Sequence, residues 1–192
     1  EPSTQAVALA ADVDKDPRLV EVILSESIRV VRARRGVLIV EHRLGFIMAN
    51  AGVDQSNVAP VDGSHRVLLL PENPDRSAET LRRGLAAATG TDLAVVINDS
   101  FGRPWRQGTA GVAIGVAGLP ALIDLRGRPD LFGRRLEVSV IGFADEVAAA
   151  ASLVMGQANE ALPVVLIRGL RWSAPESTAA SIVRPPNEDL FR

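Results

Sequence analysis

The sequence predicts an α+β fold, and three observations lead to that class. The chain has 192 residues, about the size of one domain or of one domain with a small lobe. Hydrophobic residues make up 47% and charged residues 23%, which is typical of a folded globular protein. Short apolar runs of strand length outnumber the helical segments and do not alternate strictly with them. We therefore expect mixed sheets with flanking helices rather than a doubly wound sheet.

The first periodic segment is predicted to be a helix of about four to five turns that begins at Asp16 and Pro17. Aspartate is a good N-cap, and proline suits the first helical position. The apolar residues that share one stripe are Leu19, Val22, Ile23 and Val30. Arginines at 32, 34 and 35 precede Gly36, which we expect to form the C-cap. A net charge of −2 favours this cap over a nucleic-acid-binding patch.

The remaining elements follow from apolar runs and the residues that bound them. Apolar runs bounded by turn residues predict strands, and capped periodic segments predict helices. The predicted strands are residues 37–40, 46–48, 67–70, 93–97, 136–141 and 163–167. The predicted helices are residues 75–88 and 143–157, and residues 101–108 are a predicted loop. The first two strands are joined by a polar turn and are expected to pair as a hairpin or as adjacent strands.

The composition excludes several classes of chemistry. With no cysteine there is no disulfide, thiolate metal site or cysteine nucleophile, and a reducing, cytoplasmic setting is expected. Because Lys15 is the only lysine, an anion must be held by arginine, backbone amides or metal. The longest apolar run, residues 112–123, is too short to cross a membrane, and the charge balance argues against a nucleic-acid partner. His42 and His65 are too few for a zinc cluster, and each is expected to be structural or exposed.

A candidate metal site follows the strand 46–48. Residues 49–57, ANAGVDQSN, combine small side chains with one carboxylate and several amides. Small side chains let a ligand approach the backbone, and Mg²⁺ needs only one or two protein oxygen ligands besides water. Asp54 is therefore a candidate metal ligand. A turn capped by its own side chains is the alternative interpretation of this segment.

A second cluster of the same form, Asn98-Asp99-Ser100, follows the predicted strand 93–97, so two strand-end carboxylates are available to share a metal. The next residues place Arg103 and Arg106 around Trp105 with no acid between them. Guanidinium groups bind phosphate or carboxylate oxygens in pairs. We therefore expect an anion-binding role for both arginines, and an exposed arginine stacked on the tryptophan is the alternative.

Three glycines punctuate the apolar run that follows. Gly111, Gly115 and Gly118 have a spacing that differs from the dinucleotide-binding pattern G-x-G-x-x-G. We expect them to allow tight backbone packing, either within the chain or at a subunit interface. The sequence also lacks G-x-S-x-G, so no nucleophile triad is recognised.

Five segments carry a resemblance to a known family. They are ANAGVDQSN (49–57), LLPENPDRSA (69–78), NDSFGRPWRQG (98–108), AIGVAG (113–118) and LVMGQA (153–158). Together they resemble the coenzyme F420-0:L-glutamate ligase family, and the closing RPPNEDLFR is similar to its bifunctional actinobacterial members. The resemblance implies a family-specific α+β ligase fold, a homodimer, and one ligase domain over residues 1–192. The family has a further amino-terminal segment that carries part of its GTP site, and the resemblance implies that residues 1–192 lack this segment.

The resemblance further implies an enzyme that joins L-glutamate to coenzyme F420-0 and then adds γ-linked glutamate, using GTP and Mg²⁺ or Mn²⁺. The metal ligands that it implies are Asp54, Asp99, Ser100 and Gln157, with Ser100 and Gln157 at a second metal. The nucleotide-binding residues that it implies are Asn57, Met155, Gly156 and Gln157. The roles of Arg103 and Arg106 rest on guanidinium chemistry and not on the family.

The implied reaction suits the residues present. A carboxylate is a poor electrophile, so amide formation requires an activated acyl group, which an acyl phosphate supplies. Metal ions and positive charge at the triphosphate favour in-line transfer of the γ-phosphoryl group without a protein nucleophile. The predicted catalytic residues are Asp54 and Asp99, which act through the metal, and Arg103 and Arg106. The alternatives are another metal- and nucleotide-dependent ligase that acts on a different acid, and a non-catalytic metal-binding fragment.

Overall fold

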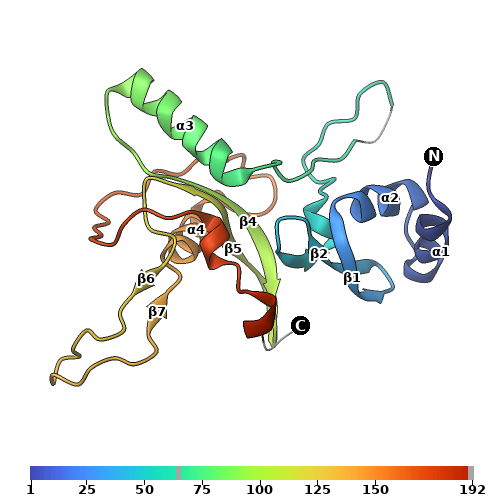
Figure 1. Ribbon diagram of the computed structural model, residues 1–192. Coiled ribbons are helices and arrows are strands. Elements are labelled where there is room, and N and C mark those ends of the chain that lie inside the picture. Colours follow the sequence, from blue (N-terminus) through green and yellow to red (C-terminus); the bar gives the residue numbers. More distant parts are fainter. Residues whose placement is uncertain (64–65, 190–192) are drawn as a thin grey trace. The chain divides into compact units, whose positions relative to one another are not determined.

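The structure is a computed structural model that describes residues 1–63 and 66–189 (Figure 1). It contains helices and small antiparallel sheets, which confirms the predicted α+β class. The chain divides into two compact units. Unit 1 comprises residues 1–70 with the chain's end from Pro185, and unit 2 comprises residues 71–184. His65 lies outside the described residues.

Unit 1 packs two helices against a three-stranded sheet. The helices are α1 (Thr4–Val13) and α2 (Pro17–Ser25), and the sheet has the order β1 (Ser27–Arg34), β2 (Val37–His42) and β3 (Ile47–Ala49). Both strand pairs are antiparallel. The predicted pairing of strands 37–40 and 46–48, which are β2 and β3 here, is confirmed. The buried core residues are Ala6, Ala10, Val13, Val20, Ile23, Leu38, Val40 and Ala51.

The first predicted helix is only partly right. Asp16 caps α2 as expected, with its carboxylate accepting a hydrogen bond from the Arg18 amide at 2.8 Å. The helix nevertheless ends at Ser25, and residues 27–34 form β1. Val30 fits a helical stripe, but it pairs with Val40 in the sheet, so long-range pairing overrides the local periodicity. Gly36, with φ of +83°, lies in the β1–β2 turn and does not cap a helix.

His42 is fully buried in unit 1, which confirms its structural role. The Leu44 amide donates to its Nδ1 at 3.0 Å, so the neutral ring carries its proton on Nε2, which faces Glu26 Oε2 at 3.5 Å. Burial is the main cause that lowers the pKa of His42, with the charge of Arg43 adding to it and Glu26 opposing it. The folded chain therefore favours the neutral ring.

We expect the chain to lose stability as the pH falls below about 6.5, where an unfolded histidine takes up a proton that the folded one resists. In that window the unfolded state binds more protons, so the free energy of unfolding rises with pH. Thermal unfolding from about pH 5 to 8 measures the effect. His42→Gln, which keeps His65, should flatten the profile, and an unchanged slope would contradict the assignment.

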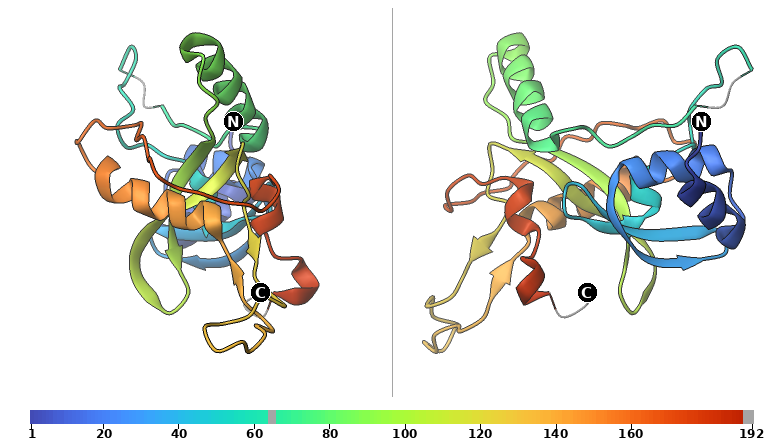
Figure 2. Two further views of the ribbon diagram at one scale, coloured as in Figure 1. Left: turned by 90° about the vertical axis from the view of Figure 1, so that its left-hand side faces the viewer. Right: turned by 45° about the vertical axis from the view of Figure 1, so that its right-hand side comes forward.

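Unit 2 is built around a long two-stranded ribbon of β4 (Val95–Arg103) and β5 (Arg106–Ala117). The helices α3 (Pro74–Thr89) and α4 (Phe143–Met155) both pack against β5 and flank the ribbon (Figure 2). A second hairpin pairs β6 (Ile123–Asp124) with β7 (Val140–Ile141). The short helix η2 (Ala179–Ile182) also belongs to unit 2, whereas the short helices η1 (Asn50–Gly52) and η3 (Pro186–Glu188) belong to unit 1. The buried core residues of unit 2 are Ala113, Val116, Leu119, Ala121, Ala144, Ala148 and Ala179.

Several predicted elements of the second half differ from the structure. Helices 75–88 and 143–157 are confirmed, but α4 stops at Met155 because Gly156 adopts φ of +74°. The predicted loop 101–108 is instead the end of the ribbon, which turns within Pro104 and Trp105. The predicted strand 136–141 shrinks to β7, because only Val140 and Ile141 find a partner strand. The structure forms no strand over 67–70 or 163–167.

The two missing strands lack partners. In the first, Leu68 makes one isolated bridge to Asp54 and is 57% exposed, so the predicted burial is wrong. The second, residues 163–167, is apolar and has no ladder among the described residues. Apolar composition favours a strand only where another strand edge is available to pair with it.

The glycines of β5 allow both helices to approach the ribbon closely. A methyl group on Gly111 would lie 2.6 Å from the Ala148 carbonyl oxygen of α4, and one on Gly115 would meet the backbone of Pro74 in α3. In the ladder these glycines lie opposite Ser100 and Ile97, which are an odd number of residues apart. A register shift between Ile97 and Asn98 leaves Ile114 as an extra residue in β5, so Gly111 and Gly115 face opposite sides and α4 and α3 cover opposite faces of the ribbon. The predicted tight packing is confirmed within the chain.

Carboxylates at the starts of both helices fasten them to β5. Asp75 in α3 accepts a hydrogen bond from the Val116 amide at 2.8 Å, and Asp145 in α4 accepts one from the Ala113 amide at 2.9 Å. Burial raises the pKa of the Asp145 carboxyl, against the opposing effect of the Ala113 hydrogen bond. The ribbon is therefore held between two helices.

None of the helices that the structure describes has the length and apolar character needed to cross a membrane.

Candidate functional site

A left-handed turn in unit 1 precedes the first candidate residue. Asn50, Ala51 and Gly52 follow β3 with φ values of 52°, 55° and 66°. Asn50 fastens the turn, because its Oδ1 accepts a hydrogen bond from the Leu38 amide at 3.1 Å. Ala51 is buried, and the neighbours of Gly52, the side chains of Met48 and Leu70, leave little room for a side chain. Left-handed backbone at non-glycine residues is costly, and such strain is common at functional sites.

Asp54 lies just after this turn with an exposed side chain. Its backbone exchanges two hydrogen bonds with Leu68, of 3.0 and 2.8 Å. Its carboxylate accepts from the Ser56 amide at 2.8 Å and from the Ser56 hydroxyl at 2.7 Å. The capped turn that we kept as an alternative is thus the local geometry. It does not use up the carboxylate, which has about four acceptor positions, so the metal role stays a prediction.

Asn57 lies in unit 1 too, exposed and with φ of +53°. Asparagine tolerates the left-handed region better than most residues because its short side chain can hydrogen-bond locally. Its placement on an exposed turn three residues after Asp54 suits a ligand contact. Its predicted contact with the nucleotide stays a prediction.

Asp99 and Ser100 lie on β4 in unit 2, and both are half-buried. They pair with Val112 and Gly111 of β5, so their side chains leave opposite faces of the ribbon. Ser100 lies on the face that α4 covers, since its ladder partner Gly111 contacts α4. The Ser100 amide also donates to Asp99 Oδ1 at 2.7 Å. Opposite faces are compatible with the prediction that these residues serve different metals.

Arg103 and Arg106 flank the turn at the end of the ribbon. Trp105 between them is 90% exposed and has φ of +63°. Arg106 is exposed, whereas Arg103 Nη1 is buried and has no hydrogen-bond partner in the described part of the chain. Leaving a buried cationic donor without an acceptor is costly. An incoming anion would supply the missing acceptor, so Arg103 fits the predicted anion-binding role.

The predicted nucleotide-binding residues Met155, Gly156 and Gln157 form the carboxyl end of α4. The Gly156 amide donates to the Ser152 carbonyl oxygen at 3.2 Å and closes the helix. The Glu160 carboxylate lies against Gly156, where any side chain would collide with it. It accepts a hydrogen bond from the Ala158 amide at 2.8 Å, and such backbone bonds hold the pKa of Glu160 below its usual value. Sequence reasoning missed Glu160, and no pattern in the sequence marks it.

The donor set fits a hard cation. Among the described residues, no three histidine, cysteine, aspartate or glutamate side chains gather into a metal cluster. The predicted ligands offer carboxylate, hydroxyl and amide oxygens, which are the ligands that Mg²⁺ and Mn²⁺ prefer. Mg²⁺ is commonly held by one or two carboxylates together with water and substrate phosphates. Asp54 and Asp99 are therefore sufficient in kind for such a site.

Comparison with known proteins decides the family. The family described as F420-0:Gamma-glutamyl ligase matches residues 1–169. The chain belongs to this family. Every predicted site residue of the chain, from Asp54 to Gln157, falls inside the range that the F420-0:Gamma-glutamyl ligase family matches.

Curated relatives agree with this membership. A protein of Methanopyrus kandleri named coenzyme F420:L-glutamate ligase is 48% identical over 197 residues, which cover 100% of this chain and 76% of the relative. Proteins with the same name from Methanothermobacter thermautotrophicus and Methanococcus maripaludis are 49% and 45% identical. Each alignment covers 100% of this chain and 75% of the relative. The resemblance recognised from the five sequence segments is thereby confirmed.

Proposed function

We propose that the chain ligates L-glutamate to coenzyme F420-0 and then adds further γ-linked glutamate. The observation that carries this proposal is the match to relatives that bear the ligase name, at 45% to 49% identity over 100% of this chain. The proposal includes GTP as the co-substrate and Mg²⁺ or Mn²⁺ as the metal. The oxygen donors of Asp54 and Asp99 and the buried cationic donor of Arg103 support these finer parts.

Each candidate residue has a distinct task in the proposed reaction. Metals held by Asp54 and Asp99, with Ser100 and Gln157 as the predicted ligands of a second ion, would supply charge neutralisation at the triphosphate. Arg103 donates to a phosphate oxygen from a buried position, where the interaction is stronger than in water. Arg106 adds a second guanidinium at the exposed end of the ribbon. Asn57, Met155 and Gly156 contact the nucleotide.

The chemical step proceeds through an acyl phosphate. F420-0 carries a lactyl carboxylate, the group that the family joins to glutamate. An oxygen of this carboxylate attacks the γ-phosphorus of GTP, and the bond between that phosphorus and the bridging oxygen breaks to release GDP. The amine of glutamate then attacks the acyl carbon and loses a proton, and the carbon–oxygen bond breaks to release phosphate. No protein nucleophile takes part, in keeping with the absence of cysteine.

A mass spectrum of the product tests the function directly. The chain is incubated with F420-0, GTP, Mn²⁺ and glutamate, and each component is omitted in turn. We expect a product heavier by one glutamyl residue only in the complete mixture. GDP release that depends on a different acid would favour another ligase. If the chain binds metal but forms no product, the result would support the alternative that it is a non-catalytic metal-binding fragment.

Isotope transfer tests the acyl phosphate. With heavy oxygen in the lactyl carboxylate, we expect one labelled oxygen to appear in the released phosphate, because that oxygen bridges carbon and phosphorus in the intermediate. The measurement is the mass of the phosphate after a complete turnover. Phosphate made from unlabelled F420-0 in heavy water is the control for exchange with solvent. Unlabelled phosphate alongside normal amide formation would point to a covalent or nucleotidyl intermediate.

A homodimer in a reducing, cytoplasmic setting completes the proposal. Leu131 and Phe132 are 96% and 94% exposed, and such apolar side chains are typical of surfaces that meet a partner. The absence of cysteine suits a reducing compartment. The molar mass in solution, from light scattering, tests the dimer.

A further inference from the structure

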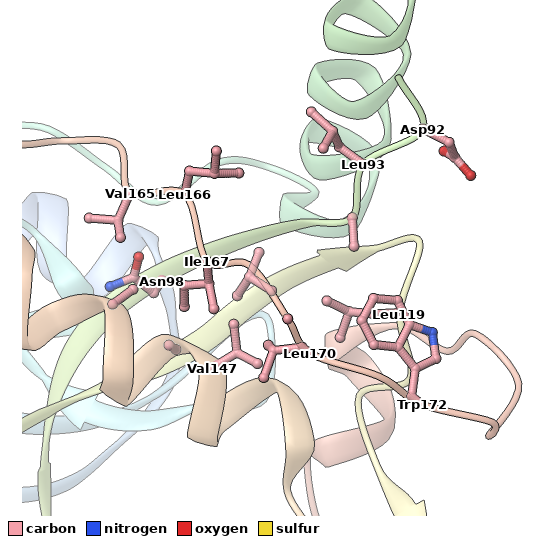
Figure 3. A pocket seen from close by; sticks show the side chains of 15 residues that line it. Asp92, Leu93, Asn98, Leu119, Val147, Val165, Leu166, Ile167, Leu170 and Trp172 are labelled. Carbon is pink, nitrogen blue, oxygen red and sulfur yellow. The ribbon is translucent and has the colours of Figure 1, made fainter. Parts of the chain in front are cut away.

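Unit 2 contains a cavity of about 250 Å³ that no predicted site residue lines (Figure 3). It lies on the α4 face of the ribbon, where Val96 and Asn98 of β4 meet Ala151 of α4. Residues 165–172 pass over it and close the other side. Ribbon, helix and covering segment all belong to unit 2, so the cavity is a feature of one compact unit.

The lining of the cavity selects against charge. Its walls are mainly aliphatic, with the indole of Trp172 at one end, and no arginine or lysine lines it. Asp92 is the one charged lining residue, but its side chain is 80% exposed and is paired with Arg82 at 2.9 Å. Its carboxylate points away from the cavity in Figure 3. Phosphates and carboxylates therefore find no cationic side chain inside.

Asn98 is the one polar side chain that reaches the cavity from the ribbon (Figure 3). No hydrogen bond to another described residue engages its amide. A side-chain amide offers one acceptor and two donors, a pattern that matches the alternating carbonyl and N–H groups of a heterocyclic ring edge. Apolar walls with few convergent polar groups are typical of sites for small ligands.

The segment that covers the cavity is able to adjust. Val165, Leu166 and Ile167 all line the cavity, and exposure alternates along them: Val164 and Leu166 are 85% and 61% exposed, whereas Val165 and Ile167 are half-buried. The alternation is that of a strand, yet residues 162–172 make no backbone hydrogen bond to other described residues. Residues 162–172 can therefore move without breaking hydrogen bonds of a β-sheet. A ligand can widen the cavity at little cost in backbone hydrogen bonds.

We infer that this cavity binds the flat aromatic ring system of one of the two large substrates, either the F420-0 chromophore or the guanine of GTP. The inference rests on the proposed function. A volume of about 250 Å³ is below the range of about 300–1,000 Å³ that encloses a whole drug-sized ligand. The cavity thus holds the ring and leaves the charged remainder outside.

The position of Asn98 connects the cavity to the proposed chemistry. Asn98 precedes Asp99 and lies on the same face of β4 as Ser100, because Asn98 and Ser100 are two positions apart in the strand. That spacing corresponds to about 7 Å along a strand. A ring held at Asn98 can therefore extend its charged end along β4 toward Ser100, the predicted ligand of the second metal.

Filling the cavity tests the inference. Ala151→Leu places a larger side chain in it, and Asn98→Leu keeps a similar volume but removes the amide. We expect each variant to weaken binding of one substrate by about 10-fold or more. The matched control is Ala150→Leu, which puts the same side chain on an exposed neighbour in α4. Circular dichroism and thermal unfolding verify that each variant folds.

Binding is measured without turnover, so that it is independent of ligation. The probes are F420-0, followed by the fluorescence anisotropy of its chromophore, and GTP, followed by calorimetry. Weaker F420-0 binding alone identifies the chromophore as the occupant, and weaker GTP binding alone identifies the base. Unchanged affinity for both substrates in folded variants overturns the inference while leaving the proposed function intact. A wild-type chain that binds neither substrate overturns both.

Discussion

Replacing Asp99 by asparagine is expected to abolish ligation and leave the fold intact, and the same is expected of Asp54→Asn. Each change keeps the volume of the side chain but removes the negative charge that a hard cation needs. Loss of a group that merely supports a metal ligand already costs about 10- to 100-fold, so loss of a direct ligand is expected to cost more than about 100-fold in activity. This is the largest functional effect that we predict.

The hydrogen bonds of both residues explain why folding survives. Asp99 Oδ1 accepts from the Ser100 amide, and Asp54 accepts from the Ser56 amide and hydroxyl. An asparagine Oδ1 is still an acceptor at each place. The charge is therefore removed while each of these hydrogen bonds keeps an acceptor.

Activity across a Mn²⁺ titration measures the effect of each variant. The matched control is Asp12→Asn, which neutralises an exposed carboxylate on α1 that belongs to no predicted site. It should retain wild-type activity. Partial rescue of Asp54→Asn or Asp99→Asn at high Mn²⁺ would agree with weakened metal binding. Full activity at ordinary metal levels would remove that residue from the metal site.

Local signals were sufficient for the helices of unit 2. The periodicity and cap of α3, with the Asn73 side chain accepting from the Arg76 amide, are short-range features that the sequence displays. The same holds for the body of α4, although the helix was predicted to run to residue 157 and in fact ends at Met155, before Gly156. Elements that depend on a distant partner were harder. Residues 27–34 carry both a helical stripe and β-branched alternation, and the ladder to β2 decides between them.

The ribbon shows the reverse error. Residues 98–103 are polar and rich in turn formers, so they suggest a loop, but they continue β4 because β5 offers a long antiparallel partner. Residues 163–167 look like a strand and have no ladder among the described residues. In both cases pairing, which is a long-range property, outweighs composition.

The candidate site divides in the same way. Asp54, Asp99 and the arginines were found from their residue types and order along the chain. The buried Nη1 of Arg103, the Glu160 carboxylate against Gly156 and the cavity beside Asn98 arise only when separate segments pack together. No pattern along the sequence carries that information.

Gly115→Ala is expected to cause the largest loss of stability among single substitutions in the ribbon. A methyl group at this position would collide with the backbone of Pro74. That backbone has little freedom to withdraw, because the adjacent Asp75 carboxylate holds the amides of both Val116 and Ala179 at 2.8 Å. Overpacking a well-packed interior costs about 1–3 kcal/mol, and a rigid neighbour places this case at the upper end or beyond.

The midpoint of urea unfolding is measured for Gly115→Ala and for the control Gly102→Ala, and the difference between them reports the cost of the collision with Pro74. Gly102 lies in the same ribbon, and a methyl group there would meet nothing within 4 Å, so its loss of stability should be small. Equal midpoints for the two variants would show that α3 yields to the added methyl group.

The collision also reaches the candidate site, because Gly115 lies opposite Ile97, two residues before Asp99 on β4. Pushing α3 off this face shifts the strand that carries the carboxylate. Under conditions where Gly115→Ala is still folded, we therefore expect its ligase activity to fall together with its Mn²⁺ affinity, while Gly102→Ala keeps the wild-type Mn²⁺ affinity.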